Sequence, residues 1–175
     1  MTGEMRRTQM LRMLKERTEP VSGTALAKHF HVSRQVVVQD IALMRAENQQ
    51  ILSTNKGYLC RAVSQEPTQP MRVFYVRHED DRVMEEFMAV LELGGRILDV
   101  AVEHELYGQI RVDLIIETVQ DARNFTEKLF TCRDNPLKVL TGGCHYHTVA
   151  APSERLLDLI EEELRQKGIL HLEQE

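Results

Sequence analysis

Two histidines separated by one residue, His145 and His147, lie in a segment whose composition predicts a β-strand. Because alternate side chains of a strand share a face, both imidazoles point to one side of the sheet, whereas Cys144, Tyr146 and Thr148 point to the other side. Two imidazoles at this spacing can chelate one ion. The pattern therefore indicates a candidate metal site.

A third histidine and one carboxylate complete the candidate ligand set. His78 follows the first expected strand of the C-terminal part, and Glu86 lies further along in an expected helix. The apolar stripe of that helix consists of Val83, Phe87, Val90 and Leu91. At about 100° per residue, Glu86 lies at the flank of this stripe and Glu85 almost opposite it, so we expect Glu86 to face inward.

The chemistry of these side chains restricts the ion but does not prove a metal site. A His-x-His pair in a strand is more often a hydrogen-bonded surface pair, so spacing alone leaves both interpretations open. Imidazole nitrogens with one carboxylate suit Zn, Ni, Fe or Mn and exclude Ca or Mg as the natural occupant. The expected cofactor is therefore a divalent transition metal of unspecified identity.

The N-terminal part has the pattern of a winged helix-turn-helix. Ser22 and Ser33 are residues of the N-cap type, and Val37, Ile41 and Met44 form one apolar stripe in the helix that Ser33 begins. A turn at residues 54–57 separates two short apolar segments, as in a hairpin wing. The expected elements are helices at 6–17, after Ser22 and after Ser33, followed by a hairpin at 51–59.

The third helix has the composition of a recognition helix. Arg34, Gln35, Val36 and Gln39 are expected to face outward near its N-terminal end, and Lys56 lies in the turn of the wing. Arginine pairs with guanine and glutamine with adenine in the major groove, while a wing lysine can reach the DNA backbone. We therefore predict binding to double-stranded operator DNA, with a helix-turn-helix used only for protein contacts as the alternative.

Charge divides the chain in the same way as this motif. Residues 1–63 contain ten Lys/Arg and five Asp/Glu, a net charge of +5, whereas residues 64–175 carry a net charge of −10, in agreement with −5 for the whole chain. A basic head suits contact with phosphates, since binding releases condensed counterions.

The length of 175 residues allows two small domains, each with its own core. The segment 64–70 contains two prolines and no large apolar residue, which is typical of a linker. We predict a DNA-binding domain at 1–63, a linker at 64–70 and a second domain at 71–175. No apolar run has the length of a membrane span, and the N-terminus lacks the apolar stretch of a signal peptide, so we expect a cytoplasmic protein.

The C-terminal part alternates expected strands and helices. Strands are expected at 72–76, 97–103, 109–116, 137–140, 144–150 and 169–172, with helices at 80–93, 118–130 and from Ser153. Two hairpins, each followed by a helix, indicate a loose internal duplication. The predicted fold class is α+β: a winged helix-turn-helix joined to an α/β sandwich-like domain with an antiparallel or mixed sheet and helices on one side.

Three segments resemble a known family. The head looks like the helix-turn-helix of the biotin-repressor type. The segments Val-Arg-His-Glu-Asp (76–80), Val-Glu-His-Glu-Leu-Tyr-Gly-Gln-Ile-Arg (102–111) and Gly-Gly-Cys-His-Tyr-His-Thr-Val (142–149) resemble the three-histidine (3H) domain. Together they cover nearly the whole chain and resemble the niacin-responsive transcriptional repressors of NAD biosynthesis and salvage genes. The resemblance implies a homodimer, nicotinic acid as co-repressor and a divalent transition metal held by His78, Glu86, His145 and His147.

The resemblance also suggests where the effector binds. His104 lies in the second histidine segment, and we assign it with Tyr107 and Arg111 to effector binding or to the wall of the site. A pyridine carboxylate can offer its ring nitrogen or its carboxylate to the metal, its carboxylate to Arg111, and its ring to Tyr107 for stacking. An ordinary surface charge is an equally good interpretation of Arg111.

The predicted function is therefore transcriptional repression of genes for NAD biosynthesis, salvage or niacin uptake, with nicotinic acid sensed at the metal-containing domain. We predict no enzymatic activity, because the chain has neither a glycine-rich phosphate loop nor a Ser/His/Asp arrangement. Two alternatives remain: a regulator for which the ion itself is the signal, and a metalloenzyme fused to a DNA-binding head.

Overall fold

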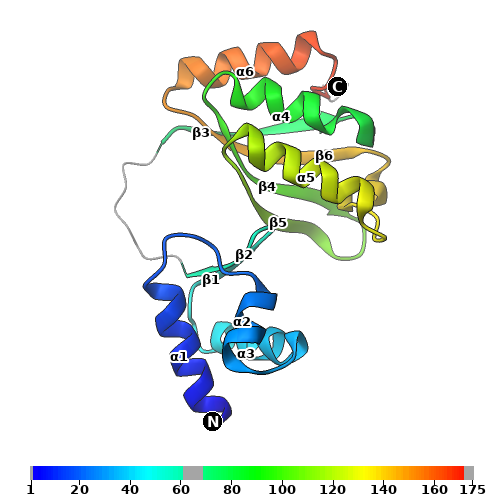
Figure 1. Cartoon of the computed structure of the whole chain (residues 1–175). Coiled ribbons are helices and arrows are strands. Elements are labelled where there is room, and N and C mark those ends of the chain that lie inside the picture. Colours follow the sequence, from blue (N-terminus) through cyan, green and yellow to red (C-terminus); the bar gives the residue numbers. More distant parts are fainter. Residues whose placement is uncertain (1, 61–68, 172–175) are drawn as a thin grey trace. The chain divides into compact units, whose positions relative to one another are not determined.

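The structure is a computed structural model that describes residues 2–60 and 69–171 (Figure 1). The chain forms two compact units, Met1–Glu66 and Pro67–Glu175, which we describe separately. Of the predicted linker at 64–70, only Gln69 and Pro70 fall within the described residues. Within the described parts, no helix combines the length and the apolar composition that a membrane span requires.

Unit 1 is a winged helix-turn-helix, as predicted. Ser22 and Ser33 are the N-caps of the second and third helices, and their hydroxyl oxygens accept hydrogen bonds from the backbone N–H groups of Ala25 and Val36. Between these helices the chain turns at His31, which has left-handed backbone angles (φ 53°). The elements are α1 (Gly3–Lys15), α2 (Gly23–Phe30), α3 (Arg34–Ala46), β1 (Ile51–Thr54) and β2 (Gly57–Cys60).

The core of unit 1 fixes the recognition helix against the other two helices. The predicted α3 stripe of Val37, Ile41 and Met44 is fully buried. It packs with apolar side chains from α1, α2 and β1, among them Met10, Leu14, Leu26, Phe30 and Ile51. The opposite face of α3 is left exposed.

The wing is anchored at its base by a close backbone contact. Val21 and Tyr58 exchange two backbone hydrogen bonds, with N–O distances of 2.8 and 2.9 Å. Gly57 has a φ of 136°, and a Cβ atom there would lie 2.4 Å from the carbonyl oxygen of Val21. Only glycine fits this position, so the hairpin and the chain before α2 are held together.

Unit 2 is built on an antiparallel sheet with the strand order β5-β4-β6-β3. Its elements are β3 (Met71–Arg77), a 3-10 turn η1 (Asp80–Arg82), α4 (Val83–Leu91), β4 (Arg96–His104), β5 (Gly108–Ile116), α5 (Val119–Thr131), a 3-10 helix η2 (Leu137–Thr141), β6 (Cys144–Ala150) and α6 (Glu154–Gln166). The expected strand at 169–172 is present as a single antiparallel bridge from Leu170 to Val76. Its last residue, Leu172, lies outside the described residues.

The helices α4, α5 and α6 lie on one face of this sheet, as predicted (Figure 1). Phe74 and Val76 of β3 point toward them, as do Ile97 of β4 and Val149 of β6. The helices contribute Phe87, Val90, Ala122, Leu157, Ile160 and Leu164 to the same core. The predicted α+β class, with helices on one side of a sheet, is confirmed.

One predicted strand is wrong. Residues 137–140 form the 3-10 helix η2, so the second hairpin and the internal duplication are absent. Gly142 ends η2 in a left-handed conformation (φ 62°), and the N–H of Gly143 bonds to the carbonyl oxygen of Lys138 at 2.8 Å. The two glycines are thus a helix cap rather than a hairpin turn.

Candidate functional site

The four predicted metal ligands converge at one buried point of unit 2. The Nε2 atoms of His78 and His145 lie 2.7 and 3.6 Å from Oε2 of Glu86. The Nε2 atom of His147 lies 3.4 Å from Oε1 of the same carboxylate. All four side chains are buried, and Glu86 is only 2% exposed. Ligand atoms of His78, Glu86 and His145 lie within 4.8 Å of one another, whereas His147 lies outside this mutually close group and approaches it at Oε1 of Glu86.

The fold explains this convergence. Within the β3–β6 ladder, His145 stands opposite Val76 and His147 opposite Phe74, so both imidazoles share the face that the helices cover. His78 follows the end of β3 beside them. On α4, Glu86 faces inward, whereas Glu85 is partly exposed and pairs with Arg82 at 2.7 Å.

Each of the three rings has a backbone carbonyl at Nδ1 and the carboxylate of Glu86 near Nε2. Their Nδ1 atoms face the carbonyl oxygens of Glu79 for His78, Gly143 for His145 and Asp99 for His147. A carbonyl only accepts, so each Nδ1 carries a proton and each Nε2 faces Glu86. The Nε2 lone pair points toward the carboxylate when a ring is neutral, and the Nε2 N–H donates to it when a ring is charged. Protons or one cation must occupy the centre between these lone pairs and the carboxylate. The donor set therefore fits a divalent transition metal.

Charges within the centre keep the carboxylate ionised. Burial acts to raise the pKa of Glu86, but the charge of His147 and hydrogen bonds from all three histidines outweigh it, so this pKa is well below its usual range. Burial lowers the pKa of His145. For His147 the nearby Glu86 charge outweighs burial and raises the pKa. A negative charge closed off from water favours a cation at this point.

Sequence reasoning missed a lysine beside the centre. Lys138 of η2 is only 7% exposed, and its Nζ atom lies 3.1 Å from the carbonyl oxygen of His78 and 2.9 Å from Oδ1 of Asp80. It thereby holds η2 against the loop that carries His78. Lysine is usually exposed, and a strand was expected here, so the sequence offered no signal for this contact.

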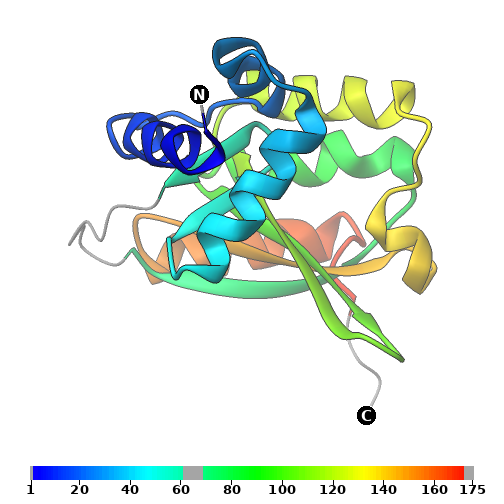
Figure 2. The ribbon, with the colours of Figure 1, turned by 90° about the horizontal axis from the view of Figure 1, so that it is seen from below.

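The predicted effector residues lie in two different places, and within the part of the chain that the structure describes none of their hydrogen bonds, ion pairs or ring contacts is to a candidate metal ligand. Figure 2 shows the β4–β5 hairpin extending from the sheet. His104 is the last residue of β4 and Tyr107 lies in the turn before β5, and their ring centroids are 4.9 Å apart. Tyr107 is 72% exposed. Arg111 stands opposite Ala101 and shares its face of the sheet, and Ala101 stands opposite Tyr146, so Arg111 is on the face away from His145.

The predicted DNA-binding residues lie on the exposed face of α3 and in the turn of the wing. Arg34, Gln35 and Gln39 are exposed, Val36 is half-buried, and Lys56 is half-buried in the wing turn. Val38 is 38% exposed and lies on the same face as Gln35 and Gln39. Val38 was not among the predicted contacts, although its position one turn after Arg34 and Gln35 indicates the same face.

An ion pair between a buried carboxylate and partly exposed arginines holds α3 against α1. Asp40 of α3 is buried, and its Oδ2 atom lies 2.6 Å from Nε of Arg6 in α1. Arg7 approaches the other oxygen at 3.6 Å. Both contacts hold α3 against α1 from the side opposite the exposed face.

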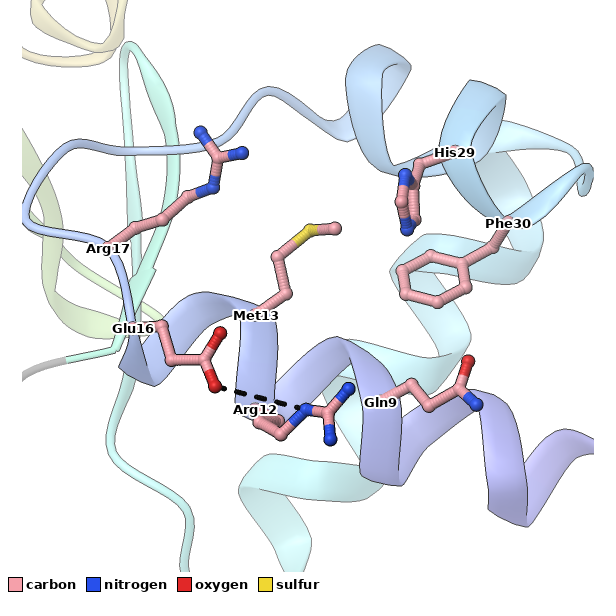
Figure 3. A pocket seen from close by; sticks show the side chains of 7 residues that line it. All are labelled: Gln9, Arg12, Met13, Glu16, Arg17, His29 and Phe30. Carbon is pink, nitrogen blue, oxygen red and sulfur yellow. Dashed lines mark ion pairs between the residues drawn. The ribbon is translucent and has the colours of Figure 1, made fainter.

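Unit 1 also has an open hollow between α1 and α2 (Figure 3). On the α1 side of it, Arg12 and Glu16 form an i,i+4 ion pair at 3.9 Å, and on the α2 side the rings of His29 and Phe30 meet edge to face. The lining residues are Gln9, Arg12, Met13, Glu16, Arg17, His29 and Phe30. None belongs to α3 or the wing, so we assign this hollow no role in DNA recognition.

Comparison with known proteins agrees with both units. Residues 71–173 match the 3H domain family, and residues 6–59 match a family of HTH domains. A probable transcription repressor NiaR from Thermotoga maritima is 38% identical over 161 residues, which is 92% of this chain and 90% of that protein. A transcription repressor NadR from Bacillus subtilis is 37% identical over 169 residues, which is 96% of this chain and 94% of that protein. The chain therefore belongs to the family of transcription repressors that join an HTH domain to a 3H domain, and it is a regulator rather than an enzyme.

Proposed function

We propose that this protein represses genes of NAD biosynthesis, salvage or niacin uptake, with nicotinic acid as co-repressor. In this proposal unit 1 binds operator DNA, and unit 2 senses the effector at a metal ion held by His78, Glu86, His145 and His147. The observation that carries the sensing part is the convergence of three Nε2 atoms on one buried carboxylate.

The ligand chemistry indicates the class of ion, a divalent transition metal, but not which member of that class binds. Three imidazole nitrogens and one carboxylate suit Ni, Zn, Fe or Mn and disfavour Ca or Mg, which prefer oxygen ligands. Four protein ligands leave open positions on a five- or six-coordinate ion. Such a position is where the ring nitrogen or the carboxylate of nicotinic acid would bind.

The contacts to the rest of the effector are also part of the proposal. His104 and Tyr107 offer two rings for stacking, and Arg111 offers a cation for the carboxylate. Because Arg111 pairs with Asp99 on the sheet face away from His145, this contact requires an effector molecule on that face rather than one bound at the ion. Nicotinic acid titrated into an Arg111→Ala variant tests the last contact. Affinity equal to that of the unaltered protein would remove Arg111 from the effector site.

We further propose that the protein acts in the cytoplasm as a homodimer. One recognition helix reads one half-site, and two half-sites on one duplex require two heads at a fixed spacing. An effector that prefers the dimer arrangement with this spacing tightens DNA binding.

Operator binding with and without each ligand tests the function. A promoter fragment of an NAD-pathway gene is titrated with metal-loaded protein in a gel shift, in the presence of nicotinic acid, nicotinamide or NAD. The proposal expects nicotinic acid to tighten the complex. A shift that depends on metal and ignores all three compounds would instead establish a regulator for which the ion is the signal.

A further inference from the structure

A β-bulge in β4 lies directly beside the candidate metal site. Ile97 stands opposite Val149 of β6, but Ala101 stands opposite Tyr146, so β4 has one extra residue in this stretch. The register to β5 also shifts between Ile97 and Asp99, but there the extra residue is in β5. A bulge leaves a residue of the longer strand outside the regular ladder, and Asp99 is in this stretch.

Asp99 accepts two hydrogen bonds from β6 at the bulge. Its carbonyl oxygen accepts a hydrogen bond from Nδ1 of His147. Its side-chain Oδ1 accepts from the backbone N–H of Thr148 at 2.9 Å. A carboxylate thus satisfies a backbone donor of β6, and the carbonyl is free to hold an imidazole.

Arg111 completes the arrangement from β5. Asp99 is only 2% exposed, and an isolated carboxylate at such a position is costly. The guanidinium of Arg111 pairs with Oδ2 of Asp99 and lies 3.1 Å from the hydroxyl of Thr148. Three neighbouring strands therefore meet at Asp99. The ion pair with Arg111 is on the sheet face away from the helices, and the His147 ring is on the face that the helices cover.

We infer that Asp99 and Arg111 are positioning residues for the metal centre, which set the tautomer and orientation of His147 through the bulge. The inference rests on the proposed metal site. Without the carboxylate, the N–H of Thr148 would compete for the carbonyl of residue 99 and draw it away from His147. The Nδ1 proton of His147 would then lose its acceptor, and the Nε2 lone pair of the same ring would lose its fixed direction.

The experiment compares Asp99→Ala and Asp99→Asn with Asp113→Ala in the full chain. Asp113 stands opposite Asp99 in the β4–β5 ladder, which makes it a matched control on the same face. Affinity for Zn²⁺ is measured by chelator competition, the absorption spectrum with Co²⁺ reports coordination, and ¹⁵N NMR of the metal-free protein reports the protonated nitrogen of His147.

We expect Asp99→Ala to weaken Zn²⁺ binding by about 10- to 100-fold and to change the Co²⁺ spectrum. Asp99→Asn keeps an acceptor for the N–H of Thr148, so its Zn²⁺ affinity should fall less. The Zn²⁺ affinity of Asp113→Ala should equal that of the unaltered protein. In a His147→Ala background, Asp99→Ala should have almost no further effect, because it acts through His147. If Asp99→Ala fails to fold, Asp99→Asn and Arg111→Ala provide the same comparison.

The outcomes separate this inference from the proposed function. Unchanged affinity and an unchanged His147 tautomer in folded Asp99 variants would overturn the inference and leave the metal site intact. Absence of Zn²⁺ and Co²⁺ binding by the unaltered protein would overturn the metal site. In that case the NMR comparison of the metal-free proteins still decides whether Asp99 holds His147.

Discussion

The Nε2 atom of His78 and the Oε2 atom of Glu86 lie 2.7 Å apart in a site closed to solvent, although one follows a strand and the other is on a helix. The next residue toward the N-terminus, Glu85, pairs with Arg82 at the surface. These neighbouring glutamates have the same chemistry and different surroundings. They are therefore a matched pair for testing the centre.

Replacement of Glu86 by glutamine should abolish tight metal binding. The change keeps the shape of the side chain but removes the carboxylate that the three histidines face, so we expect Zn²⁺ affinity to fall by more than about 100-fold. Chelator competition measures the loss. Glu85→Gln should bind Zn²⁺ as the unaltered protein does, and equal affinity in both variants would contradict the site.

Removal of the ion should lower the thermal stability of unit 2. A ligand that binds only the folded state at 100 times its Kd stabilises it by about 2.7 kcal/mol, which raises the Tm of a domain of this size by on the order of 10 °C. Scanning calorimetry with Zn²⁺ and then with excess chelator measures the difference. The Glu86→Gln variant should show the same Tm under both conditions.

Lys138 gives a prediction about the loop that carries His78. Lys138→Met keeps the apolar part of the side chain but removes its bonds to the carbonyl of His78 and to Asp80. We expect Zn²⁺ affinity to fall by up to about 10-fold, less than for a ligand, because η2 no longer fixes the loop. Lys128→Met, an exposed position on α5, is the control. A loss for Lys128→Met as large as that for Lys138→Met would contradict this role.

The sequence predicted the elements that carry the ligands because their signals are local. Strand alternation put His145 and His147 on one face, and helical periodicity turned Glu86 inward and Glu85 outward. In the structure, the β3–β6 ladder places both histidines on one face, and α4 turns Glu86 inward and Glu85 toward Arg82 at the surface. What periodicity alone left open was whether His78 meets the other three, since this depends on the pairing of β3 with β6.

The features that the sequence did not predict depend on contacts between distant segments. Lys138 is buried because η2 folds over the His78 loop, and Asp99 is buried because β4 is bulged beside β6. The same holds for η2 itself, where Gly142 and Gly143 favour a turn without specifying its type. Neither residue type nor spacing along the chain indicates such contacts.

Asp40 gives a prediction about the head. Asp40→Ala removes the buried partner of Arg6 and Arg7, so we expect the Tm of unit 1 to fall by several degrees and operator affinity to fall with it. Circular dichroism and a gel shift measure the two effects. Glu47→Gln, an exposed carboxylate just after α3, should change neither. An unchanged Tm in the Asp40→Ala variant would show that this ion pair does not hold α3.

The recognition helix and the wing should differ in how their loss affects DNA binding. Arg34 is exposed at the start of α3, where a contact to a base edge is worth about 1–3 kcal/mol, so Arg34→Ala should weaken binding to the operator far more than to unrelated DNA. Lys56→Ala should weaken both to the same extent and reduce the slope of log K against log salt by about 1, as expected for one lost phosphate contact. Fluorescence anisotropy over a range of salt concentrations measures both quantities. If Arg34→Ala weakened all sequences equally, Arg34 would be a phosphate contact and base reading would depend on Gln35, Val38 and Gln39.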